Sequence, residues 1–300
     1  MATLIKAQRQ IFIALLLTVT NFLSISYAQT PSPLIVRYLP SINDDVYSSN
    51  QYYHNLLKLA LDKTVATYGS YQLEPAPAAK TVLDAMKLMM QNSGIDIVHT
   101  NTDKTRERVL LPIRIPLDKG LIGVRLVMIN DKDNDKFKGV KEFNDLKKFK
   151  FGQGDFWPDT EILKFNNLSV HSTKEYSDLF DQLNKGTFQG FPRAVFEIWD
   201  EIKDRPGKNL AIADSFYIYY PAAIYFFVRK DSNGVLLAKR IEEGLLMAIE
   251  DGSFDKLFSV AMKSYLDKAN LNNRVGIKLR NPLLSDETPL DNPLLWYLKN

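Results

Sequence analysis

The chain has 300 residues, a formal net charge of +3, and a hydrophobic fraction of 45%. A chain of this length and composition can bury a large core, which excludes an intrinsically disordered protein and indicates one large or two medium domains. It contains no cysteine. Disulfides, thiolate metal sites and cysteine-linked lipids are therefore excluded.

Residues 1–28 have the pattern of a cleaved secretory signal. Lys6 and Arg9 precede the apolar run 11–17, and the tripeptide 26–28 supplies small residues at the positions that a signal peptidase requires. The apolar run is short for a membrane span of about 20 residues, although an uncleaved anchor is the alternative. We therefore expect a periplasmic protein.

Cleavage would remove two of the 38 basic residues and none of the 35 acidic ones, which leaves a net charge of +1. A protein this close to neutral lacks the dense positive field on which nucleic-acid binding relies. We expect no nucleic-acid partner.

Strand-like and helix-like segments alternate along the rest of the chain, which predicts an α/β architecture. The first series has expected strands at 34–38, 71–73 and 94–101 and expected helices at 53–68 and 82–90. The second series has expected strands at 149–152, 168–171 and 188–191 and helices that begin at Pro158 and Tyr176. Expected helices at 237–249 and 254–266 complete the first series.

Two β-rich segments, 121–129 and 217–225, are expected to cross between two α/β lobes. The predicted boundaries are 33–124 plus 222–269 for the first lobe, 125–221 for the second, and 270–300 for a C-terminal extension that lies over the surface with Trp296 as an anchor. Two lobes joined by two crossings create a cleft, which is where such architectures bind small ligands.

Two longer stretches carry a family resemblance. GIDIVHTNTDKTRE (94–107) and LFDQLNKGTFQGFPRAVFEI (179–198), in this order after a signal segment, resemble the periplasmic solute-binding proteins of the amino-acid type, family 3 of the extracellular receptors for ABC transporters. The likeness covers about residues 33–266. Three later stretches resemble a branch known as transporter substrate-binding domain proteins: DGSF (251–254), LRNPLLSDETPL (279–290) and LWY (295–297). The resemblance implies the two-lobed type II periplasmic-binding fold.

In that family, the loop after the third strand of the first lobe binds the carboxylate of the ligand. The resemblance assigns this role to Thr100, Asn101 and Thr102 as hydrogen-bond donors and to Arg106, whose planar guanidinium suits bidentate capture of a carboxylate. The alternative makes Thr102 a helix N-cap and Arg106 a residue paired with a neighbouring acid.

In the second lobe, Gly152 and Gly154 follow an expected strand and would let the backbone approach a ligand closely. The resemblance places this loop at the ligand. Phe156 or Trp157 would then stack on the ligand or cover the cleft, whereas burial in the core is the alternative.

The chain departs from the family where amino-acid receptors place two aspartates. Gln189 and Ala194 stand at those positions and Arg193 precedes the second, so a ligand ammonium group would lose its counter-charge. One hypothesis is that Arg193 and Arg106 clamp an anionic ligand from opposite lobes. The alternative is an ion pair between Arg193 and Glu197, four residues along the chain.

Asp155, Asp159 or Glu197 could instead supply the partner of an ammonium group. The complete set of expected ligand-binding residues is Thr100, Asn101, Thr102, Arg106, Asp155, Phe156, Trp157, Asp159 and Arg193.

The three histidines, His54, His99 and His171, do not have the spacing of a metal site, and no nucleophile elbow or phosphate-binding loop is present. We expect no metal, no cofactor and no catalysis. A dehydratase-type enzyme with His99 as general base is the minor alternative. The expected function is hinge closure on a small polar, carboxylate-bearing ligand by a monomer. The closed form would be read by an ABC permease or, alternatively, by a membrane sensor.

Overall fold

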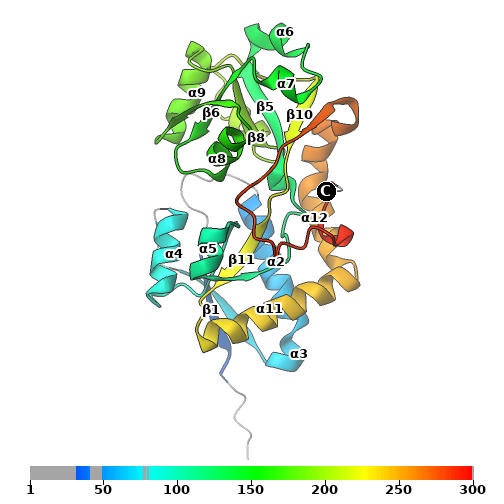
Figure 1. Cartoon of the computed structure of the whole chain (residues 1–300). Coiled ribbons are helices and arrows are strands. Elements are labelled where there is room, and N and C mark those ends of the chain that lie inside the picture. The colour runs from blue at the N-terminus through cyan, green and yellow to red at the C-terminus, as the bar shows by residue number, and fades with distance from the viewer. Residues whose placement is uncertain (1–31, 41–48, 77–78, 80, 299–300) are drawn as a thin grey trace, which may run out of the picture. The chain divides into compact units, whose positions relative to one another are not determined.

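The computed structural model describes residues 32–40, 49–76, 79 and 81–298, and the elements and contacts below belong to these residues. The expected signal segment 1–28 lies outside them. Residues Leu34–Asn300 form one compact unit, in which helices flank two β-sheets (Figure 1). Among the described residues, no helix has both the length and the apolar character that a membrane span needs.

The first sheet is built from both ends of the chain. Its strands, in spatial order, are β2 (Tyr71–Pro75), β1 (Leu34–Tyr38), β3 (Ile97–Asn101), β11 (Ile224–Val228) and β4 (Leu111–Ile113). β1 runs parallel to β2 and β3, and β11 runs antiparallel to β3 and β4. Every residue of β11 is buried, as expected for a strand covered on both faces.

Helices pack around this first sheet. They are α2 (Ser49–Lys63), α3 (Val65–Tyr68), α4 (Val82–Met90), α5 (Lys104–Val109) and α11 (Ser232–Glu250). The single helix predicted over 53–68 is divided at Thr64, because the buried Thr64 hydroxyl donates to the carbonyls of Ala60 and Leu61 and so competes with the helical bonds.

The second sheet has the order β12-β10-β5-β8-β6-β7, and β9 also pairs with β5. The strands are β5 (Val124–Asn130), β6 (Lys150–Gly154), β7 (Ser169–Thr173), β8 (Gly190–Ala194), β9 (Leu210–Ile212), β10 (Phe216–Tyr219) and β12 (Val275–Lys278). Helices α6 (Asn134–Phe137), α7 (Phe143–Leu146), α8 (Pro158–Phe165), α9 (Tyr176–Lys185) and α10 (Ile198–Lys203) accompany it. Pro158 opens α8, and Gly186 ends α9 at a φ of 79°, both as the sequence predicts.

The chain passes from the first sheet to the second between β4 and β5, and it returns between β10 and β11. These two crossings touch each other. The Tyr220 amide donates to the Gly123 carbonyl at 3.1 Å, and a Cβ on Gly123 would lie 2.0 Å from the Tyr220 carbonyl oxygen. Only glycine permits this approach, so the two crossings form one joint.

Helix α12 (Ser253–Ala269) extends from the first sheet to the second. It packs on α2 and α11, and the Tyr265 hydroxyl donates to Asp200 of α10 at 2.9 Å. The sequence predicts that the chain beyond α12 lies over the surface. The structure shows that part of this segment also belongs to a sheet. Its strand β12 runs parallel to β10 and extends the second sheet. The lobe boundaries given above remain a prediction.

Asp118 lies in the first crossing and is fully buried. Its carboxylate accepts from the amides of Gly120 (3.1 Å) and Ile122 (2.7 Å), yet burial raises its pKa to about 7. The unfolded chain has an Asp pKa of about 3.9. Between these values the folded state holds one more proton than the unfolded state, so stability falls as pH rises toward 7.

We therefore expect Asp118 to make the free energy of unfolding decrease by up to about 1.4 kcal/mol per pH unit from pH 5 to 7. Urea unfolding of the wild type and of Asp118→Asn at several pH values measures this. The difference between the two proteins should change with pH over that range and level off above it. A difference that stays constant from pH 5 to 8 contradicts the raised pKa.

Candidate functional site

A cleft of about 1090 Å³ lies beside α5. One wall is α5 with Arg114 and Lys230, the facing wall is the loop that joins β6 to α8, and the segment after β12 closes one side. The lining residues are Leu83, Met86, Asp103 to Val109, Arg114, Asp155 to Pro158, Glu161, Lys230, Pro282, Leu283, Ser285 and Glu287. A cleft of this volume can take a small molecule.

Arg106 lines this cleft from the first turn of α5. Asp103 caps the helix, accepting from the Arg106 amide at 2.8 Å, and its other oxygen pairs with the Arg106 guanidinium. The Arg106 side chain is 16% exposed. Its Nε is buried and has no hydrogen-bond partner within the described part of the chain, which is rare in folded proteins. Arg106 therefore has both an internal acid partner, as the alternative reading proposed, and an unused donor.

Thr100, Asn101 and Thr102 do not line the cleft. Thr100 and Asn101 belong to β3, where they pair with Tyr225 and Ile224 of β11. The Thr102 hydroxyl is buried and donates to Glu107 at 2.6 Å. Asp103, and not Thr102, is the N-cap of α5. Ligand contacts from Thr100, Asn101 and Thr102 remain a prediction that this geometry does not favour.

The second sheet contributes Asp155, Phe156 and Trp157 to the facing wall of the cleft. Phe156 is 75% exposed. Asp155 is half-buried and forms no ion pair with any described residue. The space above Gly154 holds the Trp157 indole and that above Gly152 holds Phe188, so neither glycine opens the backbone to a ligand. Asp155 and Glu161 are therefore both carboxylates of this wall that form no ion pair with the described residues.

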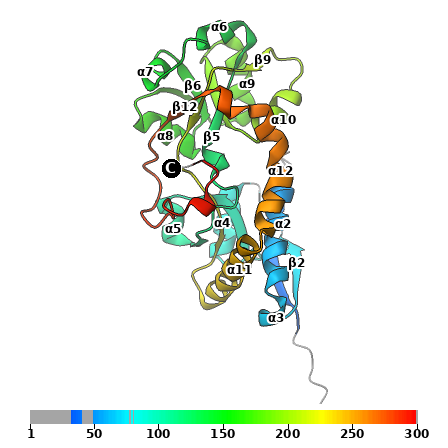
Figure 2. The same cartoon turned by 90° about the vertical axis from the view of Figure 1, so that its right-hand side faces the viewer.

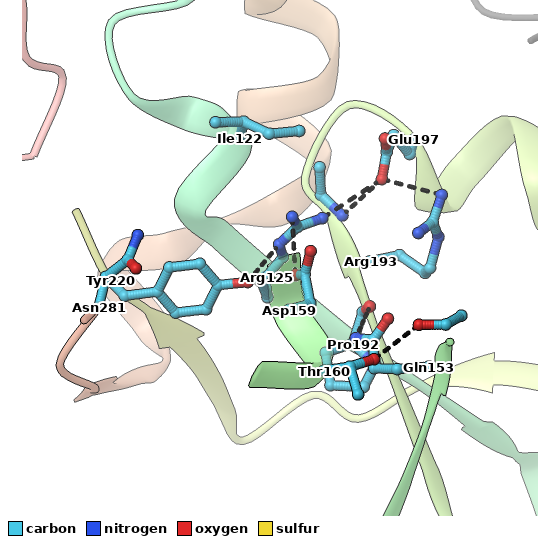
Figure 3. Close-up of polar contacts among 12 residues, drawn as sticks. Ile122, Arg125, Gln153, Asp159, Thr160, Pro192, Arg193, Glu197, Tyr220 and Asn281 are labelled. Carbon is cyan, nitrogen blue, oxygen red and sulfur yellow. Dashed lines mark hydrogen bonds and ion pairs between the residues drawn. The ribbon is translucent and has the colours of Figure 1, made fainter. Parts of the chain in front are cut away.

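Asp159 lies in a buried network at the joint between the crossings (Figure 3). It pairs with the Arg125 guanidinium at 2.8 Å and accepts a hydrogen bond from the Tyr220 hydroxyl. The Arg125 Nε also donates to the Tyr220 hydroxyl oxygen at 2.9 Å, and the Arg125 guanidinium contacts Glu197 at 3.4 Å. Asp159 is therefore buried and paired, and it does not line the cleft.

Arg193 belongs to the same network (Figure 3). Its guanidinium contacts Glu197 at 3.1 Å, the ion pair of the alternative hypothesis, and Glu201 at 2.7 Å. It also stacks 4.6 Å from the Trp157 ring centre. Arg193 is 5% exposed and does not line the cleft. The structure therefore brings Arg106, Asp155, Phe156 and Trp157 together, and it places Asp159 and Arg193 behind the second wall.

His99 lies away from the cleft, in a separate cavity of about 180 Å³ that His54 also lines. Its ring stacks on Tyr53 with 4.5 Å between centroids. Burial lowers the pKa of His99 to about 4, which makes the imidazole a weak base near neutral pH. No group of three His, Cys, Asp or Glu residues that could hold a metal is present among the described residues.

No protein-family model matches the chain, and no curated protein matches it significantly. Solved structures do match. An ancestral arginine-binding protein bound to arginine has a TM-score of 0.52 at 16% identity, over 77% of this chain and 99% of that one. An amino acid ABC transporter substrate-binding protein from Streptococcus pneumoniae, bound to L-arginine, has a TM-score of 0.52 at 18% identity, over 78% and 95%.

The chain has the two-lobed type II periplasmic-binding fold. A Salmonella typhimurium periplasmic binding protein of high arginine specificity agrees, with a TM-score of 0.51 at 16% identity over 76% of this chain and 98% of that one. These likenesses confirm the resemblance to the amino-acid type of periplasmic binding protein at the level of the fold. At these identities they say nothing about which ligand this chain binds.

Within the periplasmic-binding fold, the cleft contains a group of paired charges that the sequence did not reveal, formed by Glu107, Arg114 and Glu287. Glu107 is buried, and Arg114 contacts it at 2.7 Å and Glu287 at 2.8 Å. The pairing of Arg114 with Glu287 joins residues 173 positions apart, so no local pattern reveals it. The spacing of Thr102 and Glu107 across the start of α5 is the one local signal that could have indicated a buried acid.

Proposed function

We propose that this protein is a periplasmic solute-binding protein that captures a small carboxylate-bearing ligand, an amino acid or related organic acid, in the cleft beside α5. The observation that carries the proposal is the position of Arg106 in that cleft, opposite Asp155. A guanidinium and a carboxylate on facing walls suit a molecule with an anionic group at one end and a cationic or hydrogen-bond-donating group at the other.

The charges of the two walls support this assignment. The wall of the first sheet carries Lys104, Arg106, Arg108, Arg114 and Lys230 against Asp103 and Glu107, whereas the facing wall contributes Asp155 and Glu161. A ligand that neutralises charge on both walls stabilises the arrangement in which they approach each other. The joined crossings at Gly123 and Tyr220 provide the hinge for this closure.

The closed form is then the species that a membrane partner recognises. An ABC permease is the partner that we propose, and a membrane sensor is the alternative. Catalysis is not part of the proposal, because the similar solved structures described above are binding proteins and His99 is a weak base. The protein acts in the periplasm as a monomer in this account.

A thermal-shift screen of amino acids, dicarboxylates, keto acids and small peptides tests the function. A ligand at about one hundred times its dissociation constant adds roughly 2.7 kcal/mol to the free energy of unfolding, which gives a clear shift in Tm. We expect Arg106→Ala to weaken binding of the best ligand about 10- to 100-fold, since charge-assisted hydrogen bonds contribute about 1.5–3 kcal/mol. Calorimetric titration measures the change.

Arg37→Ala is the matched control. Arg37 lies in β1 of the first sheet and, like Arg106, has acidic partners, Glu74 and Asp96, but it does not line the cleft. This control should bind the ligand as the wild type does. Equal affinities of Arg106→Ala and the wild type would show that the ligand site lies elsewhere.

A further inference from the structure

The segment from Leu279 to Leu298, here called the C-terminal strap, is fixed to the second sheet at its start. It follows β12 directly, and the Leu279 amide donates to the Tyr219 carbonyl at 2.8 Å. The Asn166 side chain, at the end of α8, binds both the amide and the carbonyl of Arg280, at 3.0 and 2.7 Å. The strap therefore moves with the second sheet where it begins.

The strap is fixed again at the crossings. The Asn281 side chain donates to the Pro221 carbonyl at 2.8 Å. Near the other end the Trp296 ring covers Gly120, where an added Cβ would lie 2.5 Å from it, and the Tyr297 amide donates to the Lys119 carbonyl at 2.8 Å. Both ends of the strap are thus held at or beside the hinge.

The middle of the strap reaches the first sheet at α5. The Leu283 carbonyl accepts from the Lys104 amide, the first of α5, at 3.0 Å. The Glu287 carboxylate contacts Arg114 at 2.8 Å. The Glu287 side chain is 74% exposed, so this ion pair is screened by water and weak. The polar contacts of the middle of the strap with α5 and Arg114 are therefore one backbone hydrogen bond and one exposed ion pair, beside the packing of Leu283 on the core and the burial of Leu284 and Thr288.

We propose that residues Leu283 to Glu287 form a latch across the cleft, which ties α5, the helix of Arg106, to the second sheet in the protein without ligand. The inference rests on the proposed function in so far as it takes the two sheets to move relative to each other. The latch lies at the edge of the cleft, because Leu283, Ser285 and Glu287 line it. Leu283 and Glu287 are positioning residues in this proposal, since they act through α5.

The position of the latch explains why it would control the movement of the two sheets relative to each other. Helix α12 and the strap connect the two sheets on opposite sides of the molecule in Figure 2. With α12 as a rigid link on one side, rotation at the crossings changes the separation of the sheets most on the side of the strap. Releasing the latch therefore allows the two sheets to separate on the side of the strap.

The absence of cysteine allows a direct test. Spin labels on Lys87→Cys of α4 and Lys164→Cys of α8, both exposed positions, report the distance between the two sheets by pulsed electron resonance. The test variant combines Lys104→Pro with Glu287→Gln. Proline is tolerated at the first position of a helix, and Asp103 before it has the extended backbone that proline requires. The variant therefore removes the donor to Leu283 and the charge that pairs with Arg114.

The matched control combines Lys104→Ala, which keeps the amide, with Glu242→Gln, which removes an exposed carboxylate of α11 that does not line the cleft. In protein without ligand, we expect the wild type and the control to give one narrow distance distribution. The latch variant should show a second, longer distance, with a population about tenfold higher than in the wild type.

An unchanged distance distribution in the latch variant overturns the proposal. If circular dichroism shows that Lys104→Pro prevents folding, Glu287→Gln alone decides, because its exposed side chain is not needed for folding. That single variant should broaden the distribution, and an unchanged one again overturns the latch. Because no ligand is present, the outcome does not depend on whether the Arg106 site binds one.

Discussion

Replacing Arg193 by methionine is expected to lower the free energy of unfolding by about 3–5 kcal/mol. Methionine keeps most of the volume but leaves Glu201, which is 1% exposed, without the guanidinium that contacts it through Nε at 2.7 and 2.9 Å. A buried carboxylate without a counter-charge is strongly destabilising. Urea unfolding at neutral pH measures the loss.

Two further variants test the cause. The double variant Arg193→Met with Glu201→Gln should recover part of the loss, because it removes the buried negative charge that Arg193 compensates. Lys263→Met, which breaks an exposed ion pair with Asp267, should change stability by less than about 1 kcal/mol. A loss in Arg193→Met as small as that of Lys263→Met would show that the buried network contributes little.

The second large effect is expected from Gly123→Ala at the joint of the crossings. The new Cβ would lie 2.0 Å from the Tyr220 carbonyl oxygen, which is backbone and cannot rotate away. The crossings must separate to accommodate it, at a cost of about 3 kcal/mol, the upper end for overpacking. We expect a lower Tm, together with weaker binding of any ligand found in the screen because the hinge is displaced.

Gly139→Ala and Gly207→Ala are the controls for this variant. A Cβ at either position meets nothing within 4 Å, and neither glycine has a positive φ. Alanine there should leave stability unchanged or raise it slightly, by about 0.4–1 kcal/mol, through the unfolded state. Wild-type stability in Gly123→Ala would show that the crossings are not tightly joined.

Local patterns predicted most elements of the fold. Pro158 and Gly186 mark helix ends through backbone preferences that act within a few residues, and the structure places helix ends there. Strand β12 was not predicted, because it depends on a partner strand that is distant in the sequence. Its four residues join the second sheet only by pairing with β10, which begins 59 residues earlier in the chain, and no local pattern encodes such a partner.

The candidate site shows the same division. Arg106 and Asp155 could be chosen from the sequence because the resemblance places their loops at the cleft, and the structure puts both in its lining. Arg193 was expected either to face an anionic ligand or to pair with Glu197, and the structure shows ion pairs with Glu197 and with Glu201, which was not predicted. Arg125 was not selected, because it lies in an apolar strand and its partners are distant in sequence. Charged residues that tertiary packing buries can be identified only from the three-dimensional structure.

The measurement that tests the central claim most directly is the distance between the labels on Lys87→Cys and Lys164→Cys during titration with the best ligand of the screen. We expect this distance to shorten, with half the change at the dissociation constant from calorimetry, and to respond to about 10- to 100-fold more ligand when Arg106 is alanine. Ligand binding that leaves the distance unchanged, or an identical response of Arg106→Ala, would contradict a ligand held by Arg106 between two closing walls.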